Sequence, residues 1–171
     1  VFKRRPHMST AKAMLINTAN QYDWVSGPLP NRDIDRFKQG WGFPSVKNLY
    51  DLRSKMMIIN ETCILPQFGL LGASVKVYAG EPVLKVTLVW TDPPGTTSAS
   101  LHRINDLNLK VTSPSRLTYR GNWGLTSGIW STSGGAADTL NTVENVFLQN
   151  PEPGLWTVEV KALDINKDGH I

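Results

Sequence analysis

The chain has 171 residues, of which 40% are hydrophobic, and its formal net charge is +4. This length accommodates one domain or two small ones. The basic residues are scattered and no apolar run approaches the roughly 20 residues of a membrane-spanning helix, so we expect neither a nucleic-acid partner nor a membrane partner.

The start of the chain is basic and is not followed by the apolar segment of a signal peptide. We therefore expect the chain to begin inside a longer protein. Its single cysteine, Cys63, excludes an internal disulfide, and the apolar neighbours Ile64 and Leu65 predict a buried thiol. If the protein is exported, packing or a bound metal must supply its stability.

The first half of the chain predicts two short helices. Residues 9–20 carry small and apolar side chains at helical spacing, and Ser9 or Thr10 can cap the first turn by accepting a backbone hydrogen bond. A glycine-flanked aromatic turn, Gln39-Gly-Trp-Gly42, precedes a second helix over residues 45–52. Two such helices are too little to fold alone, so we expect their apolar faces to need a partner that this chain barely supplies.

From about Ala73 the hydrophobic period changes from helical spacing to two. Three runs alternate apolar and polar residues, and their apolar members are Leu84, Val86, Leu88 and Trp90; Leu107, Leu109 and Val111; and Trp156, Val158, Val160 and Ala162. Such half-buried strands are typical of a sheet with one face packed on a second sheet. We predict a mainly β fold, with an antiparallel β-sandwich over residues 61–171 and a separate helical part over residues 1–60.

Three segments of the helical part stand out as a set. They are Ser9-Thr-Ala-Lys-Ala-Met-Leu-Ile-Asn-Thr-Ala19, the Gln39-Gly-Trp-Gly42 turn and the Val46-Lys-Asn-Leu49 helix. This set resembles the end of a subtilisin-like serine protease domain, in which a helix follows the one that bears the catalytic serine and a Gly-x-Gly turn and a last helix close the domain. The resemblance implies that residues 1–60 are a short α-helical remnant of an α/β subtilisin-like domain.

Five segments of the strand-forming part make a second set. They are Val89-Trp-Thr-Asp-Pro93, Asn105-Asp-Leu107, Gly121-Asn122, Asn141-Thr-Val-Glu-Asn-Val146 and Pro153-Gly-Leu-Trp-Thr-Val-Glu-Val160. This set resembles the C-terminal jelly-roll domain of bacterial alkaline subtilases, and the two sets in this order are more specific than either alone. The resemblance implies a jelly-roll β-sandwich, structural calcium, and a secreted or extracellular protein. A sandwich of this kind normally continues past Ile171, so we expect a last strand beyond the residues given.

The catalytic residues of the resembled family are expected upstream of this chain. The family's serine lies in a Gly-Thr-Ser-Met-Ala type segment, which this sequence does not contain. The three histidines, His7, His102 and His170, are predicted surface residues with no elbow that would hold a nucleophile beside them. The resemblance therefore implies an endopeptidase with an upstream Ser/His/Asp triad, and we expect this chain alone to be inactive.

Two groups of oxygen-bearing side chains are candidate calcium sites. The first comprises Asp138, Asn141, Glu144 and Asn122, and the second comprises Asp92, Asn105 and Asp106. Calcium takes about six to eight oxygen ligands, which such groups can begin to supply. The same residue types also make Asx turns and cap strand ends. Both interpretations stand for the first group, and turns are favoured for the second.

Four tryptophans in the second half suggest an alternative function, because sugar rings stack on exposed indoles. Trp90 and Trp156 lie on apolar strand faces and are predicted core residues, whereas Trp123 and Trp130 lie in segments rich in glycine and serine. Residues 126–138 form a long loop of the kind that is often functional or mobile. One alternative is therefore a carbohydrate- or protein-binding β-sandwich module, and another is a non-enzymatic, calcium-stabilised surface protein.

The sequence as a whole favours the C-terminal part of a subtilisin-like serine endopeptidase. Small side chains in residues 9–20 would let this helix approach another element closely, so we expect the β-domain to pack on the protease domain and stabilise it. Calcium is the expected structural cofactor. The expected partners are the upstream protease domain and the protein substrates of the whole enzyme.

Overall fold

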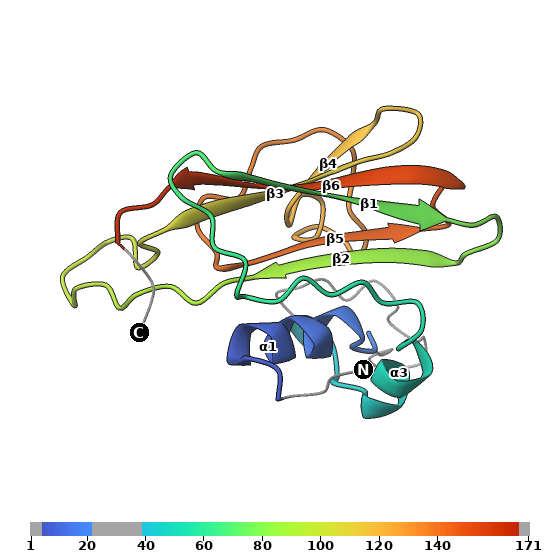
Figure 1. Cartoon of the computed structure of the whole chain (residues 1–171), viewed down its shortest axis with the longest axis horizontal. Coiled ribbons are helices and arrows are strands. Elements are labelled where there is room, and N and C mark those ends of the chain that lie inside the picture. Colours follow the sequence, from blue (N-terminus) through green and yellow to red (C-terminus); the bar gives the residue numbers. More distant parts are fainter. Residues whose placement is uncertain (1–4, 22–38, 168–171) are drawn as a thin grey trace.

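The computed structural model describes residues 5–21 and 39–167, and within these residues the protein is mainly β (Figure 1). Two antiparallel sheets, one of four strands and one of two, are accompanied by two short helices. The helices precede all of these strands in the chain, as the sequence predicted. The mainly β, antiparallel class of the fold is therefore confirmed, together with its helical start.

The four-stranded sheet has the order β1-β6-β3-β4. Its strands are β1 (Leu70–Val77), β3 (Asp106–Thr112), β4 (Thr118–Arg120) and β6 (Gly154–Asp164). All of its pairs are antiparallel, and β6 pairs with β1 along one side and with β3 along the other. This sheet therefore has β1 at one edge and the short strand β4 at the other.

The second sheet pairs β2 (Val83–Val89) with β5 (Val143–Gln149). The period of two in β2 is confirmed, because Leu84, Val86 and Leu88 pack against the hydrophobic core. Both sheets contribute to that core, whose buried members are Val77, Leu109, Val111, Val146, Leu148, Trp156 and Val160. One shared apolar cluster therefore holds the two sheets together.

Helix α3 (Val46–Asp51) confirms the second predicted helix. Ser45 is its N-cap, and the Ser45 hydroxyl accepts a hydrogen bond from the Asn48 backbone amide at 3.1 Å. This bond satisfies one of the amide groups that the start of a helix leaves without an intrahelical partner. The Asn48 side chain donates to Thr18 O, which ties α3 to the residues that follow the first helix.

Helix α1 (Met8–Asn17) confirms the first predicted helix, although it ends earlier than predicted. The predicted capping by Ser9 or Thr10 is wrong, because the N-cap residue is His7 and no side chain caps this helix. Both hydroxyls instead donate to side chains of residues 60–61. They attach the start of the helix to the segment that leads into β1, and this tertiary contact replaces the local one.

Helix α1 packs on β2, in the layer that Figure 1 shows beneath the two sheets. The Asn17 side-chain amide donates to the Lys85 carbonyl at 3.1 Å and to the Thr87 hydroxyl at 3.0 Å. The Lys85 ammonium in turn donates to Ala19 O at 3.2 Å, just beyond the end of the helix. The expectation that the chain barely supplies a partner for this helix is therefore wrong, because β2 packs against it.

Two further expectations concern single residues. Cys63 is exposed and not buried, because it lies in the irregular segment between α3 and β1, where most residues face solvent. Trp90 is half-buried at the end of β2, so it is not a core residue. Trp156 is buried as predicted, and its indole N–H donates to Glu152 O at 2.9 Å.

Candidate functional site

A buried polar cluster lies where β3 and β5 approach each other, and Glu144 is at its centre. This side chain is fully buried on the core-facing side of β5. Its Oε2 accepts a hydrogen bond from Leu109 N of β3 at 2.7 Å, whereas Oε1 has no partner among the described residues. Burial raises the pKa of the Glu144 carboxyl to about 8, and the charges of Asp138 and Asp106 act in the same direction. Near neutral pH the group is therefore mostly protonated.

Gly121 makes room for this carboxyl group. Its Cα lies so close to Glu144 that an added Cβ would overlap Oε2. The Gly121 amide donates to Leu109 O at 3.0 Å, and the Leu109 amide donates to the Glu144 carboxyl group. Glu144 and Gly121 together therefore complete the backbone hydrogen bonds of Leu109 beyond the end of β4. The position needs a glycine because of this close approach and not because of its backbone conformation.

Asp138 is the centre of a hydrogen-bond network before the start of β5. Its Oδ1 accepts from the backbone amides of Leu140 and Asn141, at 2.8 and 3.1 Å. Its Oδ2 accepts from the side-chain amides of Asn122 and Asn141. The structure therefore brings Asp138, Asn141 and Asn122 together, and Asp138 is near enough to Glu144 for its charge to raise the pKa of that group.

Asn122 connects this network to the two-stranded sheet. It has a φ of 62°, a conformation that asparagine adopts more readily than most residues. Its side-chain amide donates to Val143 O, and its side-chain carbonyl accepts from Asn145 N. Asn145 is fully buried and accepts a hydrogen bond from the Thr87 hydroxyl of β2 at 2.7 Å. A continuous set of hydrogen bonds thus runs from the loop through β5 to β2.

Asp92 and Asn105, from the second predicted group, make hydrogen bonds of the kind found in turns. The Asp92 carboxylate accepts from the backbone amides of Ile104 and Asn105, at 2.6 and 2.9 Å. The Asn105 side chain accepts from the amides of Asn166 and Lys167 and donates to Lys167 O. Both oxygens of Asp92 are thus occupied by backbone donors, and Asn105 holds the segment that follows β6.

Asp106 lies beside two residues that the sequence did not single out, Arg103 and Asn108. Asp106 is buried and accepts from the Asn108 side-chain amide at 3.0 Å, and the Arg103 guanidinium lies 3.7 Å from the same oxygen. Burial raises the pKa of Asp106, and the charge of Arg103 opposes that shift. The available signal was the alternate spacing of Asp106 and Asn108, which places both on one face of β3.

The polar cluster fits a calcium ion only in part. Among the described residues, two buried oxygen atoms have no hydrogen-bond partner, Oε1 of Glu144 and Oδ1 of Asn108, and each is of the kind that a cation can satisfy. The carboxylate oxygens of Asp92 and Asp138 already accept from amide donors. Within residues 5–21 and 39–167, no three acidic, histidine or cysteine side chains gather closely enough to hold a metal ion. A calcium ion here would therefore need amide or carbonyl oxygens among its ligands.

The two loop tryptophans have different environments. Trp123 is 44% exposed, and its indole lies directly against Gly135, where an added Cβ would overlap the ring. Trp130 is half-buried and faces the large groove between the sheets and α1. The loop next to them is tied to β5, because Ser131 exchanges hydrogen bonds with the backbone of Phe147. Of this pair, Trp123 is the more exposed.

A serine, a histidine and a carboxylate meet at the start of α1, although not in the order of a catalytic triad. The Ser9 hydroxyl donates to the Glu61 carboxylate, and His7 Nδ1 lies 3.4 Å from the other oxygen of Glu61. In a triad the hydroxyl bonds to the imidazole, and the carboxylate orients the imidazole from its far side. His102 lies in an exposed loop segment, and His170 lies outside the described residues. This arrangement therefore anchors the helix and does not activate a nucleophile.

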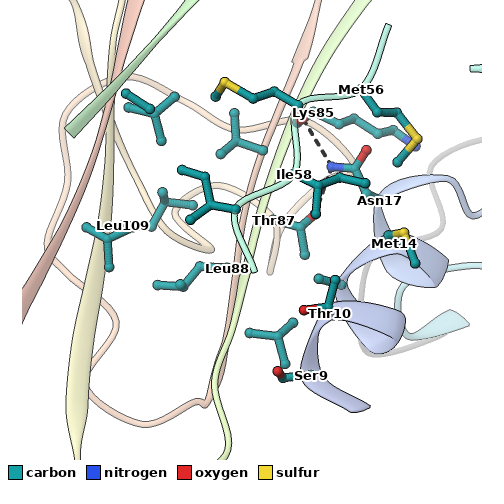
Figure 2. Close-up of a pocket in the computed structure, with 18 of the residues that line it drawn as sticks. Ser9, Thr10, Met14, Asn17, Met56, Ile58, Lys85, Thr87, Leu88 and Leu109 are labelled. Carbon is teal, nitrogen blue, oxygen red and sulfur yellow. Dashed lines mark hydrogen bonds between the residues drawn. The ribbon is translucent and has the colours of Figure 1, made fainter. Parts of the chain in front are cut away.

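A groove of about 1750 Å³ lies between β1, β2, α1 and residues 54–66. We call it the β2 groove. Figure 2 shows Thr10, Met14 and Asn17 of α1 on one side of it, and Leu88 and Leu109 on the other. Most of the side chains that line it are apolar, and its polar side chains come from α1, from β2 and from the segments around them.

Comparison with protein-family models finds no match to this chain, and comparison with curated proteins finds no similar sequence. Among the residues that the structure describes, no helix is long and apolar enough to cross a membrane. The functional interpretation therefore depends on the segments quoted from the sequence and on the contacts described above.

Proposed function

We propose that the chain is the C-terminal part of a subtilisin-like serine endopeptidase. Residues 1–60 end the protease domain, and residues 61–171 form a jelly-roll β-sandwich. The observation that carries this proposal is the docking of α1 on β2, in which the Asn17 side chain donates to Lys85 O and the Lys85 ammonium donates to Ala19 O. The segment that resembles the protease and the segment that resembles the jelly roll are thus packed on each other, as in one enzyme.

Catalysis belongs, in this proposal, to the part of the enzyme upstream of the chain. The resembled family carries its serine, histidine and aspartate there. The meeting of Ser9, His7 and Glu61 supports an anchoring role for these residues, because both the hydroxyl and the imidazole contact the carboxylate. The whole enzyme acts on protein substrates outside the cell, and this chain alone is inactive.

The β-region stabilises the last helices of the protease domain. Helices α1 and α3 have 10 and 6 residues, and isolated helices of such length are marginal in water. β2 buries one side of α1, and the two hydrogen bonds of Asn17 fix the orientation of the helix on the strand. With a single cysteine in the chain, packing of this kind takes the place of disulfides.

Calcium is the proposed structural cofactor of the polar cluster. Glu144 and Asn108 provide the buried oxygen atoms without partners, and Asp106 provides a neighbouring carboxylate. Asp138 and its asparagine partners form the network around them. When bound, the ion would supply positive charge that holds β3, β5 and the intervening loop together.

The stabilising role is tested on the whole enzyme with and without residues 61–171. We expect the truncated enzyme to lose activity faster on heating, which is measured as the half-life of casein hydrolysis at several temperatures. Asn17→Ala in the whole enzyme should shorten the half-life in the same direction, and Lys12→Ala, on the exposed side of the same helix, should not. An unchanged half-life and an unchanged specific activity after truncation would contradict the role.

A carbohydrate-binding module is the second candidate, and the environment of Trp123 favours it. The indole is fixed against Gly135 and remains 44% exposed, so it is a preformed surface on which a sugar ring could stack. The test is retention of the chain on insoluble cellulose, chitin and xylan. Retention that is lost in Trp123→Ala and kept in Tyr78→Ala, which removes another exposed aromatic, supports this candidate. No retention on any of the three removes it.

A further inference from the structure

The open edge of β2 carries backbone groups that, apart from the Lys85 carbonyl, have no partner in the part of the chain that the structure describes. Trp90 N donates to Thr142 O, and this bond shows which residues of β2 are hydrogen-bonded to β5. Because hydrogen-bonded pairs alternate in an antiparallel ladder, even-numbered residues of β2 pair with β5 and odd-numbered residues point to the opposite edge. These odd-numbered residues are Val83, Lys85, Thr87 and Val89. Within the described residues, the one donor that reaches them is the Asn17 side chain, which bonds to Lys85 O.

The β2 groove extends from this open edge to the inner face of β1. Strand β1 is the edge strand of the four-stranded sheet. Its inward residues Leu71, Ala73 and Val75 are only half-buried, and they line the groove. Residues at the centre of the same sheet, such as Leu109 and Trp156, are fully covered. The groove therefore has unpaired backbone groups along one wall and an apolar surface along another.

The rim of the groove has an excess of positive charge. Among the described residues that line it are four lysines and two glutamates, namely Lys55, Lys76, Lys85, Lys167, Glu61 and Glu81. Glu81 and Lys55 pair with each other, Glu61 is engaged by the residues at the start of α1, and Lys85 donates to Ala19 O. The lysines outside these contacts are Lys76 and Lys167. Lys76 lies opposite the start of β6 and Lys167 follows its end, so these exposed lysines flank opposite ends of the groove. This distribution favours a ligand with a carboxylate near each end.

We propose that the β2 groove accepts one extended peptide strand with acidic ends, which adds to the open edge of β2. The backbone of the peptide pairs with the groups of the odd-numbered residues of β2 other than the Lys85 carbonyl, which accepts from Asn17. Its alternate apolar side chains pack beneath Leu71, Ala73 and Val75. In such strand addition, backbone hydrogen bonds provide affinity and the pockets for alternate side chains provide selectivity. The inference needs neither a protease domain nor calcium, so it stands apart from the proposed function.

Hydrogen exchange of single backbone amides, followed by NMR, tests this proposal on the full chain. The probe is a synthetic peptide as long as β2, 7 residues, with valine and threonine in alternation and a glutamate at each end. In the free protein, the Thr87 amide should exchange fast and the Val86 and Leu88 amides slowly. The peptide should slow exchange at Thr87 at least about tenfold and leave Val86 unchanged.

Three controls distinguish strand addition from non-specific binding. A peptide methylated on its backbone nitrogens should have no effect, because it cannot pair with β2. Ala73→Trp fills the groove and should abolish the protection of Thr87, whereas Ser74→Trp, on the opposite face of the same strand, should leave it intact. The proposal is overturned if Thr87 is already protected in the free protein or stays unprotected at millimolar peptide. Equal effects of the two peptides, or of the two tryptophan variants, would also overturn it.

Discussion

At the scale of single residues, the Glu144 carboxyl has the most strongly shifted pKa among the described residues whose shifted value is known. It is fully buried, one of its oxygens has no partner, and its pKa is raised to about 8 from an ordinary value of 4.5. The folded state therefore binds a proton that the unfolded state releases between these two pH values. For this group, stability is fully present below about pH 4.5 and is lost as the pH rises toward 8.

Glu144→Gln should remove this pH dependence, because the amide is neutral at every pH and has nearly the same shape. In the presence of a chelator, the free energy of unfolding of the parent chain should fall relative to that of the variant by roughly 1.4 kcal/mol per pH unit between these two pKa values. Urea titrations at several pH values measure the difference. The control is Glu159→Gln, which should not reproduce the effect. Glu159 is a half-buried residue of β6 that pairs with Lys110. Parallel curves for the parent and Glu144→Gln would show that the buried carboxyl does not titrate in this range.

Gly121→Ala should destabilise the protein by about 1–3 kcal/mol, because the added methyl group overlaps the Glu144 carboxyl group and neither can move without disturbing the core. The matched control is Gly72→Ala on β1, where a Cβ meets no atom within 4 Å. Its effect should stay within about 0.5 kcal/mol. Thermal unfolding of both variants makes the comparison, and equal stabilities would contradict the close contact between Gly121 and Glu144.

The candidate site could be predicted from the sequence only where its members are close along the chain. Asp138 and Asn141 are three positions apart, so one loop was enough to bring them together. The neighbours of Glu144 could not be foreseen, because Leu109 and Gly121 reach it through the packing of β3 on β5, which no local pattern specifies.

At the scale of secondary-structure elements, helices and long strands follow from local periodicity, and their ends and partners do not. The alternation of Leu84, Val86 and Leu88 predicted both the strand and its buried face. Strand β4 has 3 residues, which is too short for any period to show. Ser9 looked like a cap for α1 because serine is favoured there, yet its hydroxyl bonds to Glu61, 52 positions away.

Asn17→Ala should cost about 1–2 kcal/mol of stability, because it removes two hydrogen bonds that attach α1 to β2. A double-mutant cycle with Thr87→Val isolates one of these bonds and should give a coupling of about 0.5–1.5 kcal/mol. Lys12→Ala, exposed on the same helix, is the control and should change stability by less than about 0.5 kcal/mol. A coupling of zero would mean that the helix does not stay on the strand in solution.

At the scale of the whole molecule, one apolar cluster joins the two sheets and α1 covers part of the smaller sheet. The mainly β class could be predicted because three of its strands, β2, β3 and β6, alternate apolar and polar residues. The contact of the helical part with β2 could not, because it depends on single polar side chains such as Asn17. This contact is also the observation on which we base the proposal that the two parts of the chain belong to one protein.

Calcium should raise the temperature of unfolding of the whole chain by several degrees over that in excess chelator. A ligand at about 100 times its dissociation constant raises the free energy of unfolding by about 2.7 kcal/mol. Each kcal/mol raises the unfolding temperature of a protein of this size by roughly 2–4 °C. Calorimetry measures the shift, which Glu144→Gln should remove and Glu152→Gln, far from the cluster beside Ser115, should keep. Identical transitions with calcium and chelator would leave hydrogen bonds alone as the source of order in the cluster.

The most direct test of the central claim asks whether this chain and a reactive serine belong to one polypeptide. The native protein is captured from its source with antibodies against residues 61–171, treated with a fluorophosphonate that labels active serine hydrolases, and digested for mass spectrometry. We predict a labelled serine within a Gly-Thr-Ser type segment that is covalently continuous with the residues of this chain. A captured polypeptide that contains this chain and carries no labelled serine, at full occupancy of a control protease, would contradict the claim.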